Sequence, residues 1–482
     1  HKFRRTLATQ AIDKGMPIEQ VQRLLGHVKI DTTLHYAMVN QSNVKMAHRK
    51  FLGYFYFANF VNFSEGTETM AEQKYTISDI IETYISGDWG NDEPTEDASC
   101  PVSCIRGADI VPIYNSEYRN IPLRYISEKS LSNRALREGD IVIEKSGGSP
   151  TQSTGRVVYI SKELLEEKQD IVCSNFCAAF RIKPEWDAKY VYYYLQHIYN
   201  AGVFFNFEGK TSGLKNLIMD TAFKSITIKK IAIETQRSIA TVLSTIVSKM
   251  AANRAINHYL EAMAKQLYDY WFVQFDFPDE NGMPYKSSGG KMVWNEKLKR
   301  EIPEEWTNCT LDYFLTIKNG KDHKHLGLGE YPVYGSGGEM RRVNDFLYNG
   351  ESVLMPRKGS LNNILYVNEP FWSVDTMFYS EMKYCGCAKY VFYSIKDIDF
   401  TRLDSGTGVP SMTSSTLYAI PLIKPEDEII QKFDNTISPL FHEMATLFTE
   451  IKKLSLLRDE LISLLMNGQV SVRQLNNDLA NG

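Results

Sequence analysis

The feature that most constrains this fold is a heptad stripe that occurs twice in the chain. Apolar positions follow one another at alternating spacings of four and three residues from Ile239 to Trp271. The same stripe returns in the same phase from Phe433 to Leu465, 194 residues later. Heptad spacing is typical of helices that pack against a partner along their whole length. Each stripe therefore predicts a helix of roughly 50 Å, at about 1.5 Å per residue.

Two asparagines, Asn253 and Asn257, fall on the first stripe. A polar residue in such a seam can fix the register of a helix pair at a cost in stability. The same residues are equally consistent with an imperfect, partly exposed seam. The sequence leaves both interpretations open.

The repeat extends upstream of each stripe. Residues 188–195 match residues 388–395 at an offset of 200, and residues 139–143 resemble residues 350–354. Each of the latter two segments indicates a turn, a short strand and then a loop of basic, glycine and serine residues. The sequence thus predicts a mixed α/β (α+β) fold in which two small α/β units alternate with two long helices.

Composition limits the class of protein. The 482 residues are too many for one ordinary core, and 43% apolar with 23% charged residues is typical of globular chains. Because no run of about 18 apolar residues exists, a membrane protein is not expected. The seven cysteines lack the spacing of zinc ribbons. Because Cys173 and Cys177 would share a strand face, buried thiols are favoured over a metal site. The small and odd number of cysteines argues against disulfides, and so a cytoplasmic location is expected.

Charge is unevenly distributed along the chain. The formal net charge is only −4, so any DNA-binding surface has to come from local basic loops. Residues 1–53 hold nine Lys and Arg against three Asp and Glu, whereas residues 54–99 hold one against ten. The acidic junction therefore separates two unlike parts of the chain.

Six motifs between Met70 and Val472 resemble the DNA specificity subunit of type I restriction-modification systems. They are Ser-Gly-Asp-Trp-Gly at 86–90, Ile-Arg-Gly-Ala-Asp-Ile at 105–110, Gly-Asp-Ile-Val-Ile-Glu-Lys-Ser-Gly-Gly at 139–148, Trp-Phe-Val-Gln-Phe-Asp-Phe-Pro at 271–278, Tyr-Lys-Ser-Ser-Gly-Gly at 285–290 and Tyr-Pro-Val-Tyr-Gly-Ser-Gly-Gly at 331–338. The resemblance implies two target-recognition domains, each reading one half of a split double-stranded DNA sequence. It also implies that the two long helices pack as an antiparallel coiled coil in a pseudo-twofold repeat. These helices would serve as a spacer between the recognition domains and as a platform for two methyltransferase subunits.

The resemblance further implies that catalysis belongs to partner subunits. The methyltransferase and the restriction or translocase subunits would hold S-adenosylmethionine, ATP and Mg, and this chain would hold no cofactor or metal. The residues agree with that expectation. Gly209, Lys210 and Thr211 resemble the end of a phosphate-binding loop, but Phe204 stands where the motif needs its first glycine. The Asn/Asp-Pro-Pro-Tyr/Phe tetrad of methyltransferases does not occur.

Candidate DNA-binding residues follow from the chemistry of readout. Lys and Arg on glycine-rich loops hold phosphates, whereas Arg, Asn and Gln read base edges. In the first unit the candidates are Arg106, Lys145, Ser146, Gln152, Thr154, Arg156, Lys210 and Lys215. In the second unit they are Lys321, His323, Lys324, His325, Arg341, Arg342, Arg357, Lys358, Asn362 and Asn363. Any one of them is equally consistent with a solvated surface side chain, and the basic loops with ordinary hairpin turns.

The first 53 residues resemble the C-terminal end of tyrosine recombinases of the phage integrase family. The resemblance rests on His1, Arg4, His27 and Tyr36, which follow one another in the expected order. It implies that Tyr36 is a nucleophile, that Arg4 stabilises a phosphate, and that His1 and His27 handle protons and charge. The family's first arginine and its lysine would lie upstream of His1, so we expect an inactive remnant.

The predicted domains follow from these boundaries. They are a short all-α recombinase fragment at 1–53, a linker at 54–69, a first recognition domain at 70–228, a long helix and connector at 229–300, a second recognition domain at 301–421, a second long helix at 422–472 and a tail at 473–482. An in-frame read-through between two genes would explain the linker. The favoured function is a non-catalytic reader of DNA sequence. The alternative is a tyrosine recombinase, which exchanges DNA strands through a phosphotyrosine, with an unusual C-terminal extension.

Overall fold

The computed structural model describes residues 74–147, 152–211, 214–403 and 410–469. The predictions for His1, Arg4, His27 and Tyr36, with those for the linker and the tail, lie outside the described residues. The chain divides into two units, His1–Ala252 with Glu450–Gly482, and Asn253–Thr449. Each predicted long helix is therefore shared between the two units.

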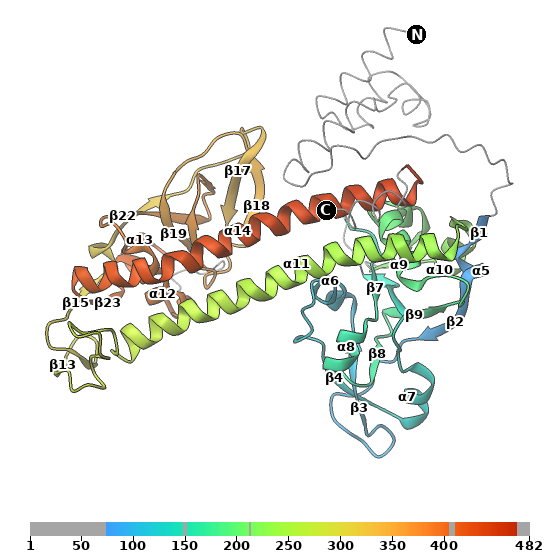
Figure 1. The fold of residues 1–482 in the computed structure, drawn as a ribbon, viewed down its shortest axis with the longest axis horizontal. Helices are drawn as coiled ribbons and strands as arrows, with labels where there is room; N and C mark the ends of the chain where they lie inside the picture. Colours follow the sequence, from blue (N-terminus) through green and yellow to red (C-terminus); the bar gives the residue numbers. More distant parts are fainter. Residues whose placement is uncertain (1–73, 148–151, 212–213, 404–409, 470–482) are drawn as a thin grey trace, which may run out of the picture. The chain divides into compact units, whose positions relative to one another are not determined.

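The first unit is a small α/β body that precedes a long helix (Figure 1). Its elements are β1 (Lys74–Thr76), α5 (Ile77–Ile80), β2 (Ile81–Ser86), β3 (Cys100–Ile105), η1 (Gly107–Asp109), α6 (Ile110–Tyr114), β4 (Leu123–Ile126), α7 (Glu128–Arg134), β5 (Ile141–Glu144), β6 (Ser146–Gly147), β7 (Val157–Tyr159), α8 (Lys162–Glu167), β8 (Ile171–Cys173), β9 (Cys177–Ile182), α9 (Ala188–Asn200), η2 (Val203–Phe207), β10 (Glu208–Thr211), β11 (Leu214–Leu217), α10 (Met219–Ser225), β12 (Thr227–Lys229) and the start of α11 (Ile233–Tyr268).

The second unit has a similar sequence of elements. They are the end of α11, η3 (Asp269–Val273), β13 (Met292–Asn295), β14 (Arg300–Pro303), β15 (Thr307–Thr310), η4 (Leu311–Tyr313), β16 (Leu315–Asn319), β17 (Leu328–Gly335), β18 (Gly338–Val343), β19 (Glu351–Pro356), β20 (Leu365–Asn368), β21 (Trp372–Ser373), β22 (Met377–Met382), α12 (Ala388–Lys396), η5 (Phe400–Leu403), α13 (Ser414–Tyr418), β23 (Pro421–Lys424) and the start of α14 (Asp427–Met466). The hairpin β13–β14 crosses residue 300, where the sequence predicted a boundary.

Sheet topology confirms the duplication. The four-stranded sheet of the first unit has the order β2-β9-β5-β7, and that of the second has the order β16-β22-β19-β20. Each unit also has a three-stranded sheet, β4-β3-β8 or β18-β17-β21, that combines one antiparallel pair with one parallel pair. The two units are thus two copies of one fold.

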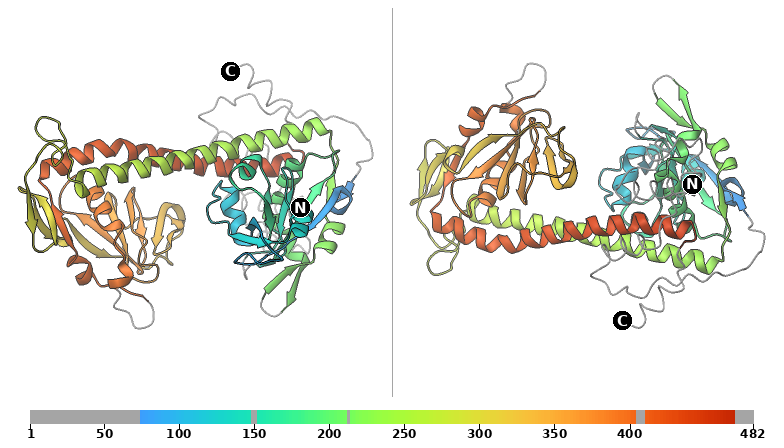
Figure 2. Two further views of the ribbon diagram at one scale, coloured as in Figure 1. Left: turned by 90° about the horizontal axis from the view of Figure 1, so that it is seen from below. Right: turned by 90° about the horizontal axis from the view of Figure 1, so that it is seen from above.

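One sheet of the first unit has no counterpart among the described residues of the second. The strands β10 and β11 form a hairpin that pairs with β6, directly after the buried strand β5. In Figure 2 this hairpin, in green, stands out from the rest of the first unit. The first unit therefore carries an additional surface element next to its basic loop.

Apolar strands and capped helices explain the local structure. All four residues of β5 are buried, as expected for a strand covered on both faces. The helix α9 starts at a cap in which Asp187 accepts a hydrogen bond from the backbone N–H of Tyr190. Its buried face, including Val191 and Leu195, packs into the core of the first unit with Leu243 of α11. These contacts fix the α/β body on the long helix.

The heptad prediction for the two helices is confirmed, since α11 and α14 have 36 and 40 residues. In the first unit Leu243, near the start of α11, shares a core with Leu465, near the end of α14. In the second unit Trp271, just after α11, shares a core with Phe433, near the start of α14. The helices are therefore antiparallel within each unit. Among the residues that the structure describes, no helix is long and apolar enough to cross a membrane.

Candidate nucleic-acid interface

A single turn gathers two surface loops in the first unit. The turn lies between β8 and β9, at residues 173–176. The carbonyl of Cys173 accepts a hydrogen bond of 2.8 Å from Asp88 N–H, in the loop after β2. The carbonyl of Phe176 accepts hydrogen bonds of 2.8 Å and 3.0 Å from the N–H groups of Lys145 and Ser146, in the basic loop after β5. We call this turn and its two loops the first loop cluster.

The second unit repeats this arrangement at residues 373–376. The carbonyl of Ser373 accepts a hydrogen bond of 2.7 Å from Lys321 N–H, in the loop after β16. The carbonyl of Thr376 accepts hydrogen bonds of 2.8 Å and 3.2 Å from the N–H groups of Arg357 and Lys358, in the basic loop after β19. This second loop cluster places the predicted residues Lys321, Arg357 and Lys358 together.

A glycine allows each turn to approach its first loop closely. A Cβ at Gly87 would lie 2.0 Å from the Ser174 carbonyl oxygen, and a Cβ at Gly320 would lie 2.0 Å from that of Val374. Only glycine fits at so short a distance. The same requirement at equivalent positions indicates that both clusters have the same backbone construction.

The first loop cluster borders the hairpin β10–β11, which collects four of the predicted residues. The Ser146 hydroxyl is hydrogen-bonded to Asn216 of β11. The Lys215 ammonium lies 3.1 Å from the Glu208 carboxylate and 3.4 Å from the Gln152 carbonyl. Lys210 lies in β10, beside Lys215 in register. The basic loop and the hairpin thus form one continuous polar surface.

Three other predicted residues of the first unit are engaged with carboxylates. Arg156 donates two hydrogen bonds, of 2.8 Å and 2.6 Å, to the buried carboxylate of Glu144, which raises the pKa of the guanidinium. The buried Thr154 donates from its N–H and its hydroxyl to Glu208. Arg106 pairs with Asp109 at 2.8 Å. Arg156 is therefore fixed to Glu144 at the end of β5, next to the basic loop, and Thr154 is fixed to Glu208 at the start of the hairpin.

In the second unit, Arg341 organises the loop after β16. Its Nε donates to Nδ1 of His323 at 3.0 Å, and its Nη2 donates to the carbonyls of His323 and Leu326. The indole of Trp372 donates to the carbonyl of Lys321 at 2.9 Å. His323 is half-buried, and the exposed side chains of residues 321–325 are those of Lys321, Asp322, Lys324 and His325.

The remaining predicted residues of the second unit differ in what they contact. Arg342 pairs with Glu339 at 2.9 Å on the hairpin β17–β18. The Asn362 side chain accepts from the N–H of Phe400 and donates to Asp399, so it fixes the start of η5. The Asn363 amide donates to the Ser336 carbonyl at 2.9 Å and joins the hairpin tip to the second loop cluster. Lys358 stays exposed.

An arginine in the first unit has the role of Arg341. Arg124 of β4 donates to the carbonyls of Trp89 and Gly90, and its guanidinium lies 4.2 Å from the centre of the Trp89 ring. The loop that the arginine holds is the loop after β2 in the first unit and the loop after β16 in the second unit. It is acidic in the first unit, with Asp88 and Asp92, and basic in the second. The two clusters therefore share a backbone frame and differ in charge.

Sequence reasoning missed the turns that gather these loops. Phe176 is 57% exposed, in contrast to the buried Cys173 and Cys177 on either side of the turn. Residues 173–177 and 373–377 lie at the same offset of 200 that links α9 and α12. The two segments share no identical residue, so only their equal spacing from α9 and α12 could have indicated that they are equivalent.

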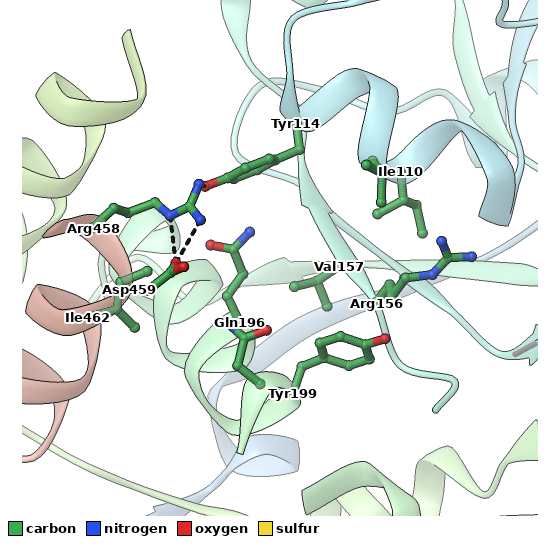
Figure 3. A pocket seen from close by; sticks show the side chains of 11 residues that line it. Ile110, Tyr114, Arg156, Val157, Gln196, Tyr199, Arg458, Asp459 and Ile462 are labelled. Atoms are coloured by element: carbon green, nitrogen blue, oxygen red, sulfur yellow. Dashed lines mark hydrogen bonds and ion pairs between the residues drawn. The ribbon is translucent and has the colours of Figure 1, made fainter. Parts of the chain in front are cut away.

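A cavity of about 160 Å³ lies elsewhere in the first unit, where the α/β body meets the end of α14 (Figure 3). The Arg458 guanidinium donates to the Tyr114 hydroxyl and pairs with Asp459 at 2.6 Å. Gln196 and Tyr199 of α9 line the same cavity. Figure 3 shows Tyr114 pointing from α6 toward Arg458. Arg458 is thus a polar contact between the α/β body and the long helix.

Three buried thiols of the first unit, those of Cys104, Cys173 and Cys177, are poor nucleophiles. Burial raises the pKa of Cys104 and of Cys177 to about 12, and it raises that of Cys173 further. A thiol with a raised pKa stays protonated near neutral pH and is unreactive. Burial of Cys173 and Cys177 agrees with the sequence prediction.

Comparison with known proteins agrees with these observations. The family model of the type I restriction modification DNA specificity domain matches residues 73–262. The specificity subunit of the type I restriction enzyme MjaIX of Methanocaldococcus jannaschii is 25% identical over 404 residues, which cover 77% of this chain and 88% of that subunit. The crystal structure of a type I S subunit from M. genitalium superposes with a TM-score of 0.51 at 16% identity. It covers 84% of this chain and 98% of its own, and so shares the fold.

The beginning of the chain has different relatives. Residues 1–43 match the phage integrase family. The tyrosine recombinase XerC of Leptospira interrogans is 46% identical over 50 residues, which cover 10% of this chain and 16% of the recombinase. Both resemblances found in the sequence are thus confirmed. Residues 73–262 thus match the type I specificity domain, and the chain resembles type I specificity subunits in sequence and shares their fold, with a segment similar to tyrosine recombinases at its start.

Proposed function

We propose that this chain is the non-catalytic DNA-reading subunit of a type I restriction-modification complex and that each unit reads one half of a split target. The first loop cluster would read one half-site and the second loop cluster the other. The observation that carries this proposal is that one backbone frame occurs twice, with different side chains on it. Repeated modules of one frame are suited to two separate half-sites.

The polar groups of the clusters fit the chemistry of a DNA contact. Backbone N–H groups and carboxylate pairs hold the loops, so their outer side chains are presented on a rigid frame. In the second unit these side chains include Lys321, Lys324 and Lys358, which can contact phosphates. In the first unit they include Lys145 and, on the hairpin β10–β11, Lys215. Preorganised cations of this kind bind DNA at a lower cost in conformational entropy.

The long helix α11 offers a surface for the methyltransferase subunits. Within the second unit, Ile256, Tyr259 and Met263 are 43%, 72% and 53% exposed and lie on one face of the helix. Ala255 and Ala262 are exposed on the same face. The positions 194 residues later on α14 include Glu450 and Lys453, so the equivalent face there is more polar. An exposed apolar stripe on a helix fits an amphipathic helix of a partner.

The reactions would take place in the partner subunits. S-adenosylmethionine would bind to the methyltransferase subunits, and ATP and Mg to the restriction subunits. This chain would supply the sequence, the spacing and the docking surface. Tyr259→Asp would place a charge in the apolar face of α11 and should weaken copurification with the methyltransferase, whereas Lys453→Asp on α14 serves as a control.

The test of the function compares the purified chain with and without its methyltransferase subunit. With S-adenosylmethionine and plasmid DNA, the chain alone should transfer no methyl group. With the partner it should direct methylation to a single bipartite sequence. Methylation by the chain alone would overturn the assignment of chemistry to the partner, and methylation without sequence preference would overturn the reading role.

A second candidate function, strand exchange by a tyrosine recombinase, is favoured by the match of residues 1–43 to the phage integrase family. In that case Tyr36 would be the nucleophile. Incubation of the chain with recombination-site DNA would trap a covalent phosphotyrosine adduct, which Tyr36→Phe would abolish. We expect no adduct, and the same variant should leave sequence-specific methylation unchanged.

A further inference from the structure

The turn of the first loop cluster displays an apolar ring that the core does not use. Phe176 is 57% exposed and stands where the two loops of the cluster meet. Single exposed apolar residues are common on protein surfaces and by themselves indicate nothing. The position of Phe176, the hydrogen-bonded backbone of its turn and its counterpart in the second unit distinguish it from such a residue.

The backbone of the turn holds Phe176 in place. Its carbonyl accepts the two hydrogen bonds from Lys145 and Ser146, and Cys177 N–H donates to the Ser174 carbonyl at 2.9 Å. The side chain takes no part in these bonds. The ring therefore projects from a turn whose backbone is already fixed, so a contact of the ring requires no further ordering of this backbone.

The surroundings of Phe176 combine apolar surface with a cation. Two residues further along, Ala178 lines a depression together with Tyr84, Ile218 and Lys145, and the exposed Asp220 lies at the same depression. Tyr84 and Ile218 are 51% and 50% exposed. An ammonium group beside apolar side chains suits a DNA groove, where the amine contacts phosphate and the apolar surface contacts base edges.

The equivalent turn residue of the second unit is Thr376. Its carbonyl accepts the two hydrogen bonds from Arg357 and Lys358, and Met377 N–H donates to the Val374 carbonyl at 3.0 Å. Phenylalanine and threonine differ in size and polarity. They share the ability to make an apolar contact with the 5-methyl group of thymine in the major groove.

We propose that Phe176 and Thr376 are specificity-determining residues, each contacting the 5-methyl group of a thymine in the half-site read by its own unit. The proposal rests on the proposed function, because it assigns a base contact to each loop cluster. It predicts that the turn residue, rather than the cations of the loops, discriminates an A·T pair at one position of each half-site.

The test uses deoxyuridine in place of thymidine, which removes only the methyl group from the DNA. The complex with the methyltransferase subunit is titrated with target duplexes that carry one such replacement at a time. For the unmodified chain, one replacement in each half-site should weaken binding about fourfold, as expected when one methyl group is removed from an apolar contact. Phe176→Ala should lose affinity by at least as much and become insensitive to the replacement in the first half-site only.

Matched variants separate this contact from a loss of structure. Thr376→Ser removes a methyl group and keeps the hydroxyl, so it should act in the same way on the second half-site. Trp294→Ala removes another aromatic ring that is 57% exposed, on the hairpin β13–β14, and should change neither half-site. An unaltered thermal unfolding profile for Phe176→Ala would show that the turn stays folded.

The possible outcomes are distinguishable. If the unmodified complex binds without sequence preference, the proposed function fails before any variant is compared. If it binds specifically, but Phe176→Ala keeps the sensitivity to every deoxyuridine replacement, the contact proposed for Phe176 is wrong. A Phe176→Ala variant that changes the second half-site would also contradict the proposal.

Discussion

The two units have the same fold but are fixed to the long helices by different chemistry. In the second unit, Lys389 of α12 pairs with Asp434 of α14 at 2.8 Å and with Glu351 of β19 at 2.7 Å. The Lys389 side chain is only 6% exposed. Two further ion pairs, Lys265–Asp397 at 3.1 Å and Lys396–Glu261, join α11 to the end of α12. Charge pairs thus hold the second α/β body on its helices.

The first unit relies mainly on apolar and neutral contacts. The Gln236 side chain of α11 accepts from the Asp187 N–H at 2.9 Å, and Tyr193 is hydrogen-bonded to Ser244 at 3.2 Å. At the end of α14, Arg458 contacts Tyr114 beside the cavity of Figure 3. We infer that the repeated fold depends on core positions that the two units share, whereas the polar contacts around the core can differ between the units.

The largest expected effect follows from removing the buried charge at Lys389. Lys389→Ala leaves two carboxylates without their cation and should destabilise the attachment of α12 by about 3 to 5 kcal/mol. Arg458→Ala should cost only about 1 kcal/mol, because water from the adjacent cavity can replace its hydrogen bonds. Hydrogen exchange of the peptides that contain α12 and α6 measures both effects. Equal losses of protection would contradict the comparison.

The ion pairs of Lys389 should also make the stability of the second unit depend on pH. Burial lowers the pKa of this ammonium, but the hydrogen bonds that it donates to Asp434 and Glu351 outweigh burial and raise the pKa overall. A raised pKa means that the stabilisation is complete below the unfolded pKa of about 10.4 and is lost as the pH rises past the folded value. The difference in urea unfolding free energy between the natural chain and Lys389→Met should therefore shrink above about pH 10.4. A difference that grew with pH would refute this account.

A smaller effect is expected at the glycines of the loop clusters. Gly87→Ala and Gly320→Ala each force a Cβ against a backbone carbonyl and should destabilise the local turn by about 1 to 3 kcal/mol. Because the two clusters have the same frame, the two costs should be similar. Hydrogen exchange of the turn peptides is the measurement. A large cost at one glycine and none at the other would show that the frames are not equivalent.

The smallest expected effect is on the salt dependence of DNA binding. Arg357→Gln with Lys358→Gln should lower the salt slope of DNA binding by about one unit for each phosphate group that the protein no longer neutralises. Lys145→Gln in the first unit removes one cation and should lower the slope by about one unit at most. Titrations at several salt concentrations give the slopes. An unchanged slope in the double variant would mean that the second basic loop does not contact phosphates.

Periodic features of this chain could be predicted from sequence because they are local. The two heptad stripes predicted α11 and α14, and the strand predicted at 141–143 is part of β5. The roles of single polar residues could not be predicted. Thr154 is held by Glu208, 54 residues away, and only the folded sheet brings these two together. The helix α14 also continues through Pro439, which the heptad pattern does not reveal.

The most direct test of the central claim is a map of methylated positions in cells that carry the methyltransferase subunit with variants of this chain. Phe176→Ala should relax the sequence requirement at one position in one half of the target, and Thr376→Ser should relax it at one position in the other half. The spacing between the halves should stay unchanged in both. A variant that relaxes both halves, or two variants that relax the same half, would contradict the assignment of one half-site to each unit.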